Sequence, residues 1–211
     1  HVGRQHPSAI DLGLERARAV LARMGLARPP VVITVGGTNG KGSTTAMLES
    51  ILRVAGYRTG LYTSPHIVRY NERVRLDGDE AGDADLVAGF EAVERARGDA
   101  SLTYFEYGTL AAFEIFARKG VEIAVLEVGL GGRLDCVNLL DADCAIVVSV
   151  DLDHQDWLGD TREAIGLEKA HVYRAGRPAI FGEASVPATV KAHAEAIGAD
   201  LQVAGRDYRF V

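Results

Sequence analysis

A glycine-rich segment between a strand candidate and a helix candidate constrains the fold of this chain more than any other feature. Residues 31–35 form a β-branched run, residues 36–42 are rich in glycine, and residues 43–55 repeat apolar side chains at helical spacing. Glycines let backbone amides turn toward a ligand without a side chain in the way. The free N–H groups at the start of the following helix attract phosphate groups. The segment therefore predicts a nucleotide phosphate site.

This segment departs twice from the usual phosphate-loop pattern G-x-x-x-x-G-K-[ST]. Val35 stands where the first glycine is expected, and Gly42 stands where a hydroxyl residue normally binds Mg²⁺. A glycine-rich turn with a surface lysine is the alternative, but strand, loop, Gly-Lys pair and helix in this order favour ATP binding. Another residue must then reach the metal. The predicted ATP-binding residues are Gly37, Thr38, Asn39, Gly40, Lys41, Gly42 and Ser43.

Strand and helix candidates alternate along the chain, which predicts an α/β fold with a mostly parallel sheet flanked by helices. An Asp-Gly turn signal at residues 77–78 adds a small hairpin beginning at residues 74–76. The other strands are expected at residues 31–35, 59–63, 122–127, 144–150, 178–181 and 200–203, and the helices at residues 11–26, 43–55, 83–96, 107–118, 161–172 and 186–197.

Two helices carry local predictions. We expect Asp11 to cap the helix at residues 11–26. In the helix at residues 43–55, the spacing predicts that Met47, Ile51 and Leu52 face the core.

Polar side chains follow three of the predicted strands. Ser64 comes directly after one strand, Glu127 ends another, and His154 follows a third. Ligands of such sheets bind outside the carboxyl ends of the strands, so we expect these side chains to lie near Lys41. Mg²⁺ prefers oxygen ligands, which Ser64 and Glu127 supply. Read alone, Ser64 is an ordinary loop serine. A solvated strand end is the alternative for Glu127, and the apolar run before it argues against that alternative. For His154, a structural role and an ion-binding role are equally consistent with the sequence.

Composition excludes several classes of protein. The net charge of −6, from 23 basic and 29 acidic residues, argues against general nucleic-acid binding. Two cysteines, Cys136 and Cys144, make neither a disulfide framework nor a zinc knuckle and suit a reducing cytoplasm. No apolar run approaches the length of a membrane span, and no signal peptide is visible. We expect a cytoplasmic protein without nucleic-acid or membrane partners.

Seven motifs, in their order and spacing over nearly the whole chain, resemble the folylpolyglutamate synthase and dihydrofolate synthase family of the Mur ligase superfamily. They are GTNGKGS at 37–43, YTSPH at 62–66, NER at 71–73, Thr103 with Phe105-Glu106, EVGLGGRLD at 127–135, Asp153-His154 with WLG at 157–159, and EKA at 168–170. The segment at residues 10–16 is similar to a stretch of bacterial dihydrofolate synthases that follows a dihydropteroate-pocket loop. The resemblance implies the phosphate-loop fold of the Mur ligase central domain.

The resemblance also implies roles for single residues. Ser64 and Glu127 would bind the Mg²⁺ that bridges the ATP phosphates, and His154 would bind a second Mg²⁺. From the residues alone, Lys169 is an ordinary surface lysine. In the family it matches a carbamylated lysine, whose added carboxylate would lie near the second metal. The implied catalytic residues are Lys41, Lys169 and His154, and the implied pterin-site residues are Thr103, Phe105 and Asp135. The chain departs from the family at Gly36, Cys136, Gln155 and His171, of which none removes an implied ligand.

The implied activity is ATP-dependent joining of L-glutamate to dihydropteroate, to folates, or to both through an acyl phosphate. Residues 1–211 would form the ATP-binding domain of a monomer; family members are about twice as long, so the carboxy-terminal glutamate-binding domain would be absent and this chain alone nearly inactive. A peptidoglycan-precursor Mur ligase is disfavoured, because only about 35 residues precede the phosphate loop. A non-catalytic ATP-binding switch and a folate-binding scaffold remain alternatives.

Overall fold

The computed structural model describes residues 13–209, apart from the side chains of residues 155 and 156. It contains one eight-stranded sheet with the order β4-β3-β2-β5-β1-β6-β7-β8. Six neighbouring strands, from β2 to β8, run parallel, and β3 and β4 form the antiparallel hairpin at one edge. The strands are β1 (Val31–Gly36), β2 (Thr59–Tyr62), β3 (Val74–Leu76), β4 (Asp79–Glu80), β5 (Ile123–Glu127), β6 (Cys144–Val147), β7 (Pro178–Phe181) and β8 (Asp200–Val203). The predicted fold class is confirmed.

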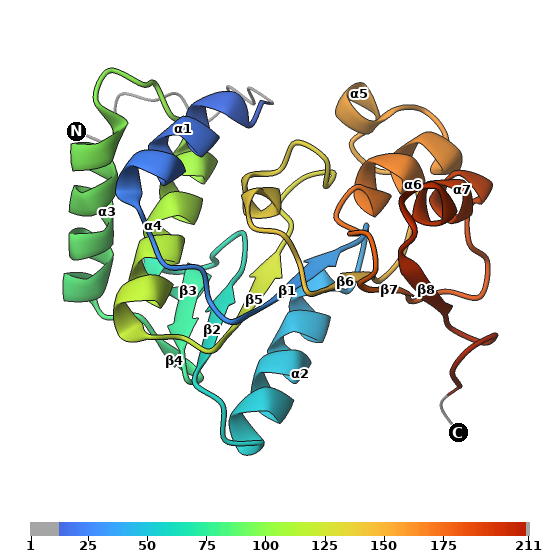
Figure 1. Cartoon of the computed structure of the whole chain (residues 1–211), viewed down its shortest axis with the longest axis horizontal. Helices are drawn as coiled ribbons and strands as arrows, with labels where there is room; N and C mark the ends of the chain where they lie inside the picture. The colour runs from blue at the N-terminus through green and yellow to red at the C-terminus, as the bar shows by residue number, and fades with distance from the viewer. Residues whose placement is uncertain (1–12, 210–211) are drawn as a thin grey trace.

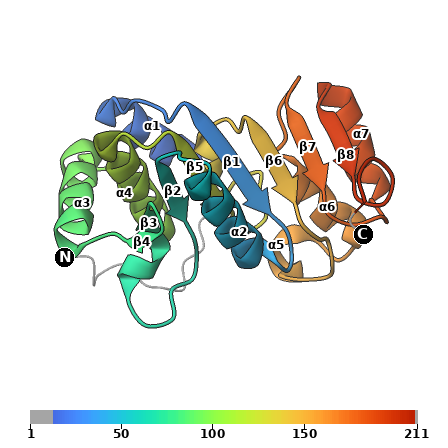
Figure 2. The ribbon, with the colours of Figure 1, turned by 90° about the horizontal axis from the view of Figure 1, so that it is seen from below.

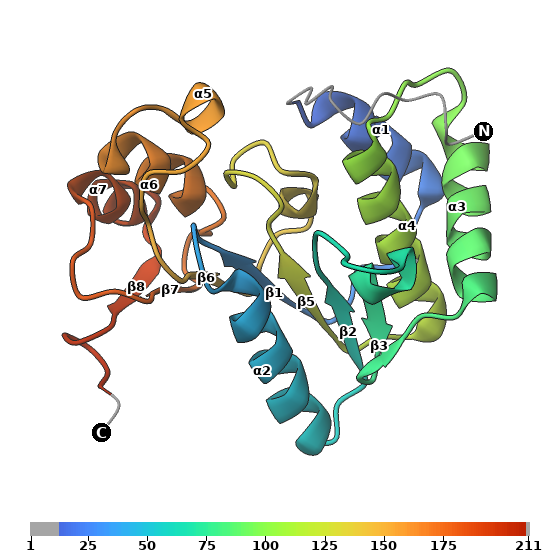
Figure 3. The ribbon, with the colours of Figure 1, turned by 180° about the vertical axis from the view of Figure 1, so that it is seen from behind.

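Helices cover the two faces of the sheet unequally. Among the described residues, α2 lies on one face, where it contacts β5, β2 and β1, and the other helices lie on the opposite face (Figure 1; Figure 3). The view from below shows α2 in front of the strands (Figure 2). The helices are α1 (Glu15–Met24), α2 (Lys41–Val54), α3 (Asp83–Arg97), α4 (Tyr104–Lys119), α5 (Gln155–Leu158), α6 (Arg162–Ala170) and α7 (Ala188–Ile197), with 3-10 turns η2 (Tyr70–Arg73) and η3 (Cys136–Leu139).

The main core lies between the sheet and the larger helical layer. Its fully buried side chains include Tyr62, Leu110, Phe116, Ile165 and Phe181. A second, smaller cluster of Val35, Leu61 and Val125 lies beneath α2. None of the described helices combines the length and the apolar character that crossing a bilayer requires.

Several helix boundaries differ from the prediction. α2 begins at Lys41, two residues early, because Gly40 adopts a φ of 81° and turns the loop directly into the helix. α4 begins at Tyr104, three residues early, because Thr103 and Glu106 form a reciprocal capping box. α1 begins at Glu15 with Leu14 at its N-cap. The predicted cap Asp11, like residues 10 and 12 of the family-like segment, lies outside the described residues.

Shorter elements were also missed or misplaced. β6 ends at Val147 rather than at residue 150, and α6 covers Arg162–Ala170 instead of 161–172 because Thr161 caps it. The segment before α6 contains the one-turn helix α5, and η2 and η3 were not predicted.

The predicted inward face of α2 is partly wrong. Met47 is 64% exposed and Ile51 65% exposed, whereas Leu52 packs against the small cluster as expected. The buried positions of the helix are Thr45 and Glu49. Apolar residues occur on more than one face of this helix, so helical spacing alone selected a face next to the one that touches the sheet.

Candidate functional site

The phosphate loop connects β1 to α2 in a conformation that requires glycine. Gly37 has a φ of 145° and Gly40 a φ of 81°, both disfavoured for other residues. A Cβ on Gly37 would lie 3.2 Å from backbone and side-chain atoms of Val148 and from the Ser149 amide. Gly40 stands at the N-cap of α2, and no side chain caps the helix. The first amides of α2 are therefore left for a ligand, which fits phosphate.

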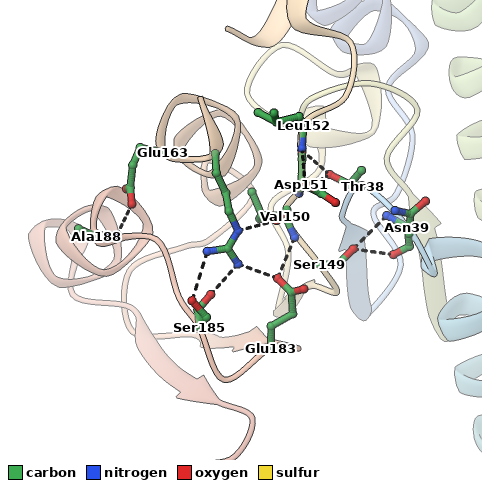
Figure 4. Close-up of polar contacts among 11 residues, drawn as sticks. Thr38, Asn39, Ser149, Val150, Asp151, Leu152, Glu163, Glu183, Ser185 and Ala188 are labelled. Carbon is green, nitrogen blue, oxygen red and sulfur yellow. Dashed lines mark hydrogen bonds and ion pairs between the residues drawn. The ribbon is translucent and has the colours of Figure 1, made fainter. Parts of the chain in front are cut away.

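Hydrogen bonds fasten this loop to the segment after β6. The Thr38 amide donates to the Ser149 carbonyl at 2.9 Å, and the Asn39 amide donates to Ser149 Oγ at 3.0 Å. Thr38 Oγ1 accepts from the Asp151 amide at 3.0 Å and lies 3.2 Å from the Asp151 carbonyl (Figure 4). Arg162 Nε donates to the Val150 carbonyl at 2.7 Å and holds the same segment from the other side. The loop shape is thus fixed by tertiary contacts.

Lys41 folds back over the loop that precedes it. Its Nζ donates to the Gly37 carbonyl at 2.8 Å and contacts the Thr38 carbonyl at 3.3 Å. Both partners are neutral carbonyl groups, so the charge of the ammonium remains available to a terminal phosphate.

Glu127 and Ser64 meet beside the start of α2. Glu127 ends β5 opposite Val35 of β1, and Ser64 follows the neighbouring strand β2. The Ser64 amide donates to Glu127 Oε2 at 3.1 Å, and among the described residues this is the one hydrogen bond to the Glu127 side chain. Glu127 is only 5% exposed, and burial raises its pKa although the Ser64 amide and the Lys41 charge oppose the rise. A buried carboxylate with so few partners suits a cation.

The unusual Gly42 also faces Glu127. A Cβ at position 42 would lie 3.9 Å from Glu127 Oε1. The carboxylate therefore approaches the place where a phosphate loop usually carries its metal-binding hydroxyl. Among the described residues, no group of three or more His, Cys, Asp or Glu side chains is arranged to hold a metal ion. A cation here would take protein oxygens from Glu127 and Ser64 and its other ligands from phosphate and water.

Lys169 is buried near the same site. It is 4% exposed on α6, and no hydrogen bond or ion pair to its ammonium occurs within residues 13–209. Burial, followed by repulsion from Lys41, lowers the pKa of Lys169 to about 8, against an opposing attraction from Asp153. A lysine with this pKa is still mostly charged at pH 7, but about a tenth of it is neutral and can react as an amine. The sequence pattern alone did not predict the burial of Lys169, because LEKA at residues 167–170 is also typical of a solvent-exposed helix end.

His154 lies on the loop that precedes α5. It is exposed, has a φ of 48°, and its Nε2 lies 3.7 Å from Asp153 Oδ2. No contact joins His154 to Ser64 or Glu127 among the described residues. The structure therefore brings Ser64 and Glu127 into contact beside Gly42, with Lys41 within electrostatic reach of Glu127 and Lys169 within reach of Lys41. It leaves His154 on the loop that precedes α5.

Two of the predicted pterin-site residues, Phe105 and Asp135, lie against the glycine turn that follows β5. A Cβ on Gly129 would lie 2.7 Å from Phe105 Cζ and 3.3 Å from Asp135 Oδ2. Asp135 Oδ2 accepts from the Gly129 and Leu130 amides, each at 2.8 Å, and Oδ1 accepts from the Val137 amide at 3.0 Å. Burial raises the pKa of Asp135 to about 6 in spite of these three amides. Asp135 thus shapes the turn against which the Phe105 ring packs.

Glu106 was not predicted as a site residue, yet it positions the predicted site residues Thr103 and Phe105. Its Oε2 accepts from the Thr103 amide at 2.7 Å, and Thr103 Oγ1 accepts from the Glu106 amide at 3.2 Å. The carboxylate is nearly buried and pairs with Arg16 Nε of α1 at 2.9 and 3.0 Å. Glu106 therefore joins α1 to the start of α4, where Thr103 and Phe105 lie. The Thr-x-x-Glu pattern of a capping box was a sequence signal for the contacts between Thr103 and Glu106, but not for the ion pair with Arg16.

Comparison with known proteins assigns the fold and its phosphate loop to a family. The model of the Mur ligase middle domain matches residues 35–181. The chain belongs to the Mur ligase middle-domain family. Its amino-acid sequence is 53% identical to dihydrofolate synthase/folylpolyglutamate synthase of Escherichia coli K12 over 206 residues, which are 97% of this chain and 49% of that protein. The chain thus spans about half the length of the curated relatives that it matches.

Solved structures of Mur ligases show the same fold. E. coli FolC in complex with DHPP and ADP superposes with a TM-score of 0.95 at 53% identity, covering 99% of this chain and 50% of that one. A bifunctional folylpolyglutamate synthase/dihydrofolate synthase with Mn, AMPPNP and L-glutamate bound gives a TM-score of 0.93 at 46% identity, covering 100% and 51%. The resemblance drawn from the sequence motifs is confirmed.

Proposed function

We propose that this chain is the ATP-binding part of a ligase that joins L-glutamate to dihydropteroate, to folates, or to both. The observation that carries the proposal is the contact of Ser64 with the buried Glu127 carboxylate beside Gly42 and Lys41. It supplies oxygen ligands for a cation where the phosphate loop has lost its own hydroxyl. The named ligands of the solved relatives, ADP, AMPPNP, Mn, DHPP and L-glutamate, agree with this assignment.

The nucleotide is ATP, held by the amides of residues 37–43 and by Lys41. Mg²⁺ bound to Ser64 and Glu127 would lie against the phosphates, where a metal acts as a Lewis acid. A second Mg²⁺ is assigned to His154, and carbamylation of Lys169 would supply a carboxylate near it. Support for the carbamate is the burial of Lys169 and its pKa of about 8, because carbon dioxide adds only to a neutral amine.

The reaction overcomes the poor leaving group of a free carboxylate. One substrate carboxylate oxygen attacks the γ-phosphorus of ATP, and the bond from that phosphorus to the bridging oxygen breaks. ADP leaves with the bridging oxygen, and the product on the substrate is an acyl phosphate. The amine of glutamate then attacks the acyl carbon, loses a proton, and expels phosphate as the amide forms. Lys41 and the amides at the start of α2 stabilise charge on the transferred group. No protein side chain needs to become a covalent nucleophile.

The pterin end of the acceptor is assigned to the residues Thr103, Phe105 and Asp135. Phe105 offers an aromatic face, and Asp135 offers a buried carboxylate beside the Gly129 turn. The Gly129 turn and the phosphate loop follow neighbouring strands, β5 and β1, so a molecule bound at both would direct its carboxylate toward Lys41. Glutamate would bind in the part of the ligase that this chain does not include. We propose a cytoplasmic monomer that binds these small molecules and neither nucleic acid nor membrane.

The experiment replaces the cation ligand and the loop lysine separately in the full-length protein. Glu127→Gln and Lys41→Ala should each lower dihydropteroate-dependent ADP release by about a hundredfold or more, because each removes charge stabilisation from phosphoryl transfer. Glu122→Gln is the matched control, since Glu122 precedes the other end of β5 and its side chain, among the described residues, bonds only to Arg58. It should leave turnover unchanged.

Two results would overturn the assignment. Near-normal turnover of Glu127→Gln would remove its role as a metal ligand. A wild-type protein that binds Mg-ATP but neither binds dihydropteroate nor releases ADP in its presence would instead be a nucleotide-binding switch.

A further inference from the structure

The backbone of Val150 lies beyond the end of β6, yet both of its polar groups have hydrogen-bond partners. Val150 is 2% exposed, and among the described residues no backbone group bonds to it. Its amide instead donates to Glu183 Oε2 at 3.0 Å (Figure 4). Its carbonyl accepts from Arg162 Nε at 2.7 Å. Because buried backbone groups need partners, these two side chains replace a neighbouring strand for Val150.

Arg162 and Glu183 also bond to each other. Arg162 Nη2 donates to Glu183 Oε2 at 3.0 Å, so that oxygen accepts from both the guanidinium and the Val150 amide. The same Nη2 donates to the Ser185 carbonyl at 2.6 Å. Arg162 is the first residue of α6, and Glu183 lies two residues after the end of β7. The pair therefore joins three segments: the start of α6, the loop after β7 and the segment after β6.

The path of the chain after β7 brings Glu183 to this place. A Cβ on Gly182 would lie 2.3 Å from the carbonyl oxygen of Val148 and 3.0 Å from its carbonyl carbon. Backbone atoms cannot turn aside as a flexible side chain can, so a side chain at position 182 would force the two segments apart. Glu183 follows Gly182 directly, which sets its carboxylate beside the Val150 amide. The contact is thus built into the close approach of two chain segments.

The segment that this ion pair holds supports the phosphate loop. Ser149 accepts hydrogen bonds from the amides of Thr38 and Asn39. The Asp151 amide donates to Thr38 Oγ1 at 3.0 Å. Val150 lies between Ser149 and Asp151 in the chain. Among the described residues, the ion pair itself forms no hydrogen bond with the phosphate loop, so any effect of its hydrogen bonds on phosphate binding passes through Val150.

The exposure of the two side chains argues for a local role. The side chain of Arg162 is 34% exposed and that of Glu183 is 38% exposed. Ion pairs with such exposure contribute little to global stability, because water screens the charges and ordering two long side chains costs entropy. The buried amide and carbonyl of Val150, by contrast, would lose their partners without the pair. Removing the pair should therefore change the shape of residues 149–151 more than the stability of the whole protein.

We propose that Arg162 and Glu183 are positioning residues for ATP binding, which act through Val150 on the phosphate loop. The pair fixes residues 149–151, and those residues fix the loop that receives the phosphates. A loop that already has its binding shape does not lose affinity to the cost of being ordered by the ligand. The proposal rests on the proposed function in naming ATP as the ligand, whereas the effect of the pair on the shape of the loop does not depend on it.

Steady-state kinetics of the full-length protein separate positioning from general destabilisation. Arg162→Ala and Glu183→Ala should each raise the KM for ATP by about tenfold, the factor that corresponds to about one hydrogen bond to a charged group. The KM for dihydropteroate should stay within about twofold of wild type. Glu183→Gln keeps an oxygen that can accept from the Val150 amide, so it should raise the KM for ATP less than Glu183→Ala. A loss of folded enzyme would lower kcat and leave both KM values unchanged.

Arg118→Ala is the matched control. Arg118 is 36% exposed, like Arg162, and pairs with Asp85 at 2.8 Å and with Glu114 at 3.0 Å between α3 and α4. Among the described residues it has no hydrogen bond with residues 149–151. Its replacement should leave both KM values within about twofold of wild type.

Amide hydrogen exchange of the ligand-free, full-length protein tests the positioning without any substrate. In Arg162→Ala, peptides that cover residues 37–43 and 148–152 should exchange about tenfold faster than in wild type, while α4 exchanges at the wild-type rate. Glu183→Ala should show the same pattern and serves as the test if Arg162→Ala does not fold.

Three results would overturn the proposal: an unchanged KM for ATP in a folded variant, exchange that accelerates equally in α4 and in the phosphate loop, and an equal rise of the KM for ATP in Arg118→Ala. Faster exchange confined to the two peptides, in a protein whose wild type does not bind Mg-ATP, would support the positioning of the loop and count against the proposed function alone.

Discussion

Replacing Lys169 by methionine should stabilise the protein while it removes the proposed carbamate. Lys169 is 4% exposed, and burial with the nearby Lys41 lowers its pKa from 10.5 to about 8. A shift of about 2.5 units corresponds to about 3 kcal/mol of free energy that the folded state loses by keeping this ammonium charged at pH 7. Methionine has a similar length and no charge, so the variant avoids that cost.

The sign of the pH dependence distinguishes this cause from a change in packing. Because the folded pKa is lower than the unfolded value, the unfolded chain holds a proton between about pH 8 and 10.5 that the folded protein has released. The free energy of unfolding of the wild type therefore rises with pH through that window and carries the whole penalty below it. The advantage of Lys169→Met should be about 3 kcal/mol at pH 7 and about 1 kcal/mol or less at pH 10.

Urea denaturation at pH 7, 8, 9 and 10 in buffers free of carbon dioxide measures the difference. Lys191→Met, at an exposed lysine of α7, is the control and should show a small difference that does not change with pH. Added bicarbonate should stabilise the wild type and leave Lys169→Met unchanged if the carbamate forms. A difference between wild type and Lys169→Met that is the same at pH 7 and pH 10 would refute the buried-charge reasoning.

Three other substitutions test the surroundings of the site. Gly129→Ala should cost about 1–3 kcal/mol, because its Cβ would lie 2.7 Å from Phe105 Cζ, and Phe105→Leu should recover part of the loss in a double-mutant cycle of urea unfolding. Glu106→Gln should cost about 1–3 kcal/mol by the same measurement, since it breaks a nearly buried ion pair; an unchanged midpoint would show that α1 is held by other contacts. Gly42→Ser should restore at least about tenfold of the Mg-ATP affinity lost in Glu127→Gln, measured by titration calorimetry, and no recovery would place the cation elsewhere.

The order of strands and helices was readable from the sequence because each element carries a local signal. The β-branched run before the phosphate loop and the Asp-Gly turn of the hairpin needed no tertiary information. The predicted helix boundaries were wrong where a local signal was overlooked, as at the capping box of Thr103 and Glu106. The prediction of which face of α2 is buried was partly wrong for a different reason. Met47 and Ile51 are apolar, and only the placement of the helix on the sheet shows that they remain exposed.

The residues of the candidate site were likewise only partly predictable from the sequence. Lys41, Ser64 and Glu127 could be found because each follows a strand, and parallel strands gather their carboxyl ends at one edge. The burial of Lys169 could not be found, because it depends on α6 packing against the loop after β5, where a Cβ on Gly132 would lie 2.7 Å from the Glu168 carbonyl. The pair of Arg16 with Glu106 spans 90 residues and has no local signature on the α1 side.

The glycine at position 42 determines where the cation must find its protein ligands. A phosphate loop with serine or threonine at this position carries its metal ligand on the same helix start that binds phosphate, so metal and nucleotide sites move together. Here the hydroxyl is absent and a buried carboxylate from β5 approaches the same place. Because the Ser64 amide holds that carboxylate, three parallel strands, β1, β2 and β5, must be in register before the cation site exists. Cation binding in this protein should therefore report the integrity of the central sheet, which binding to a single loop could not do.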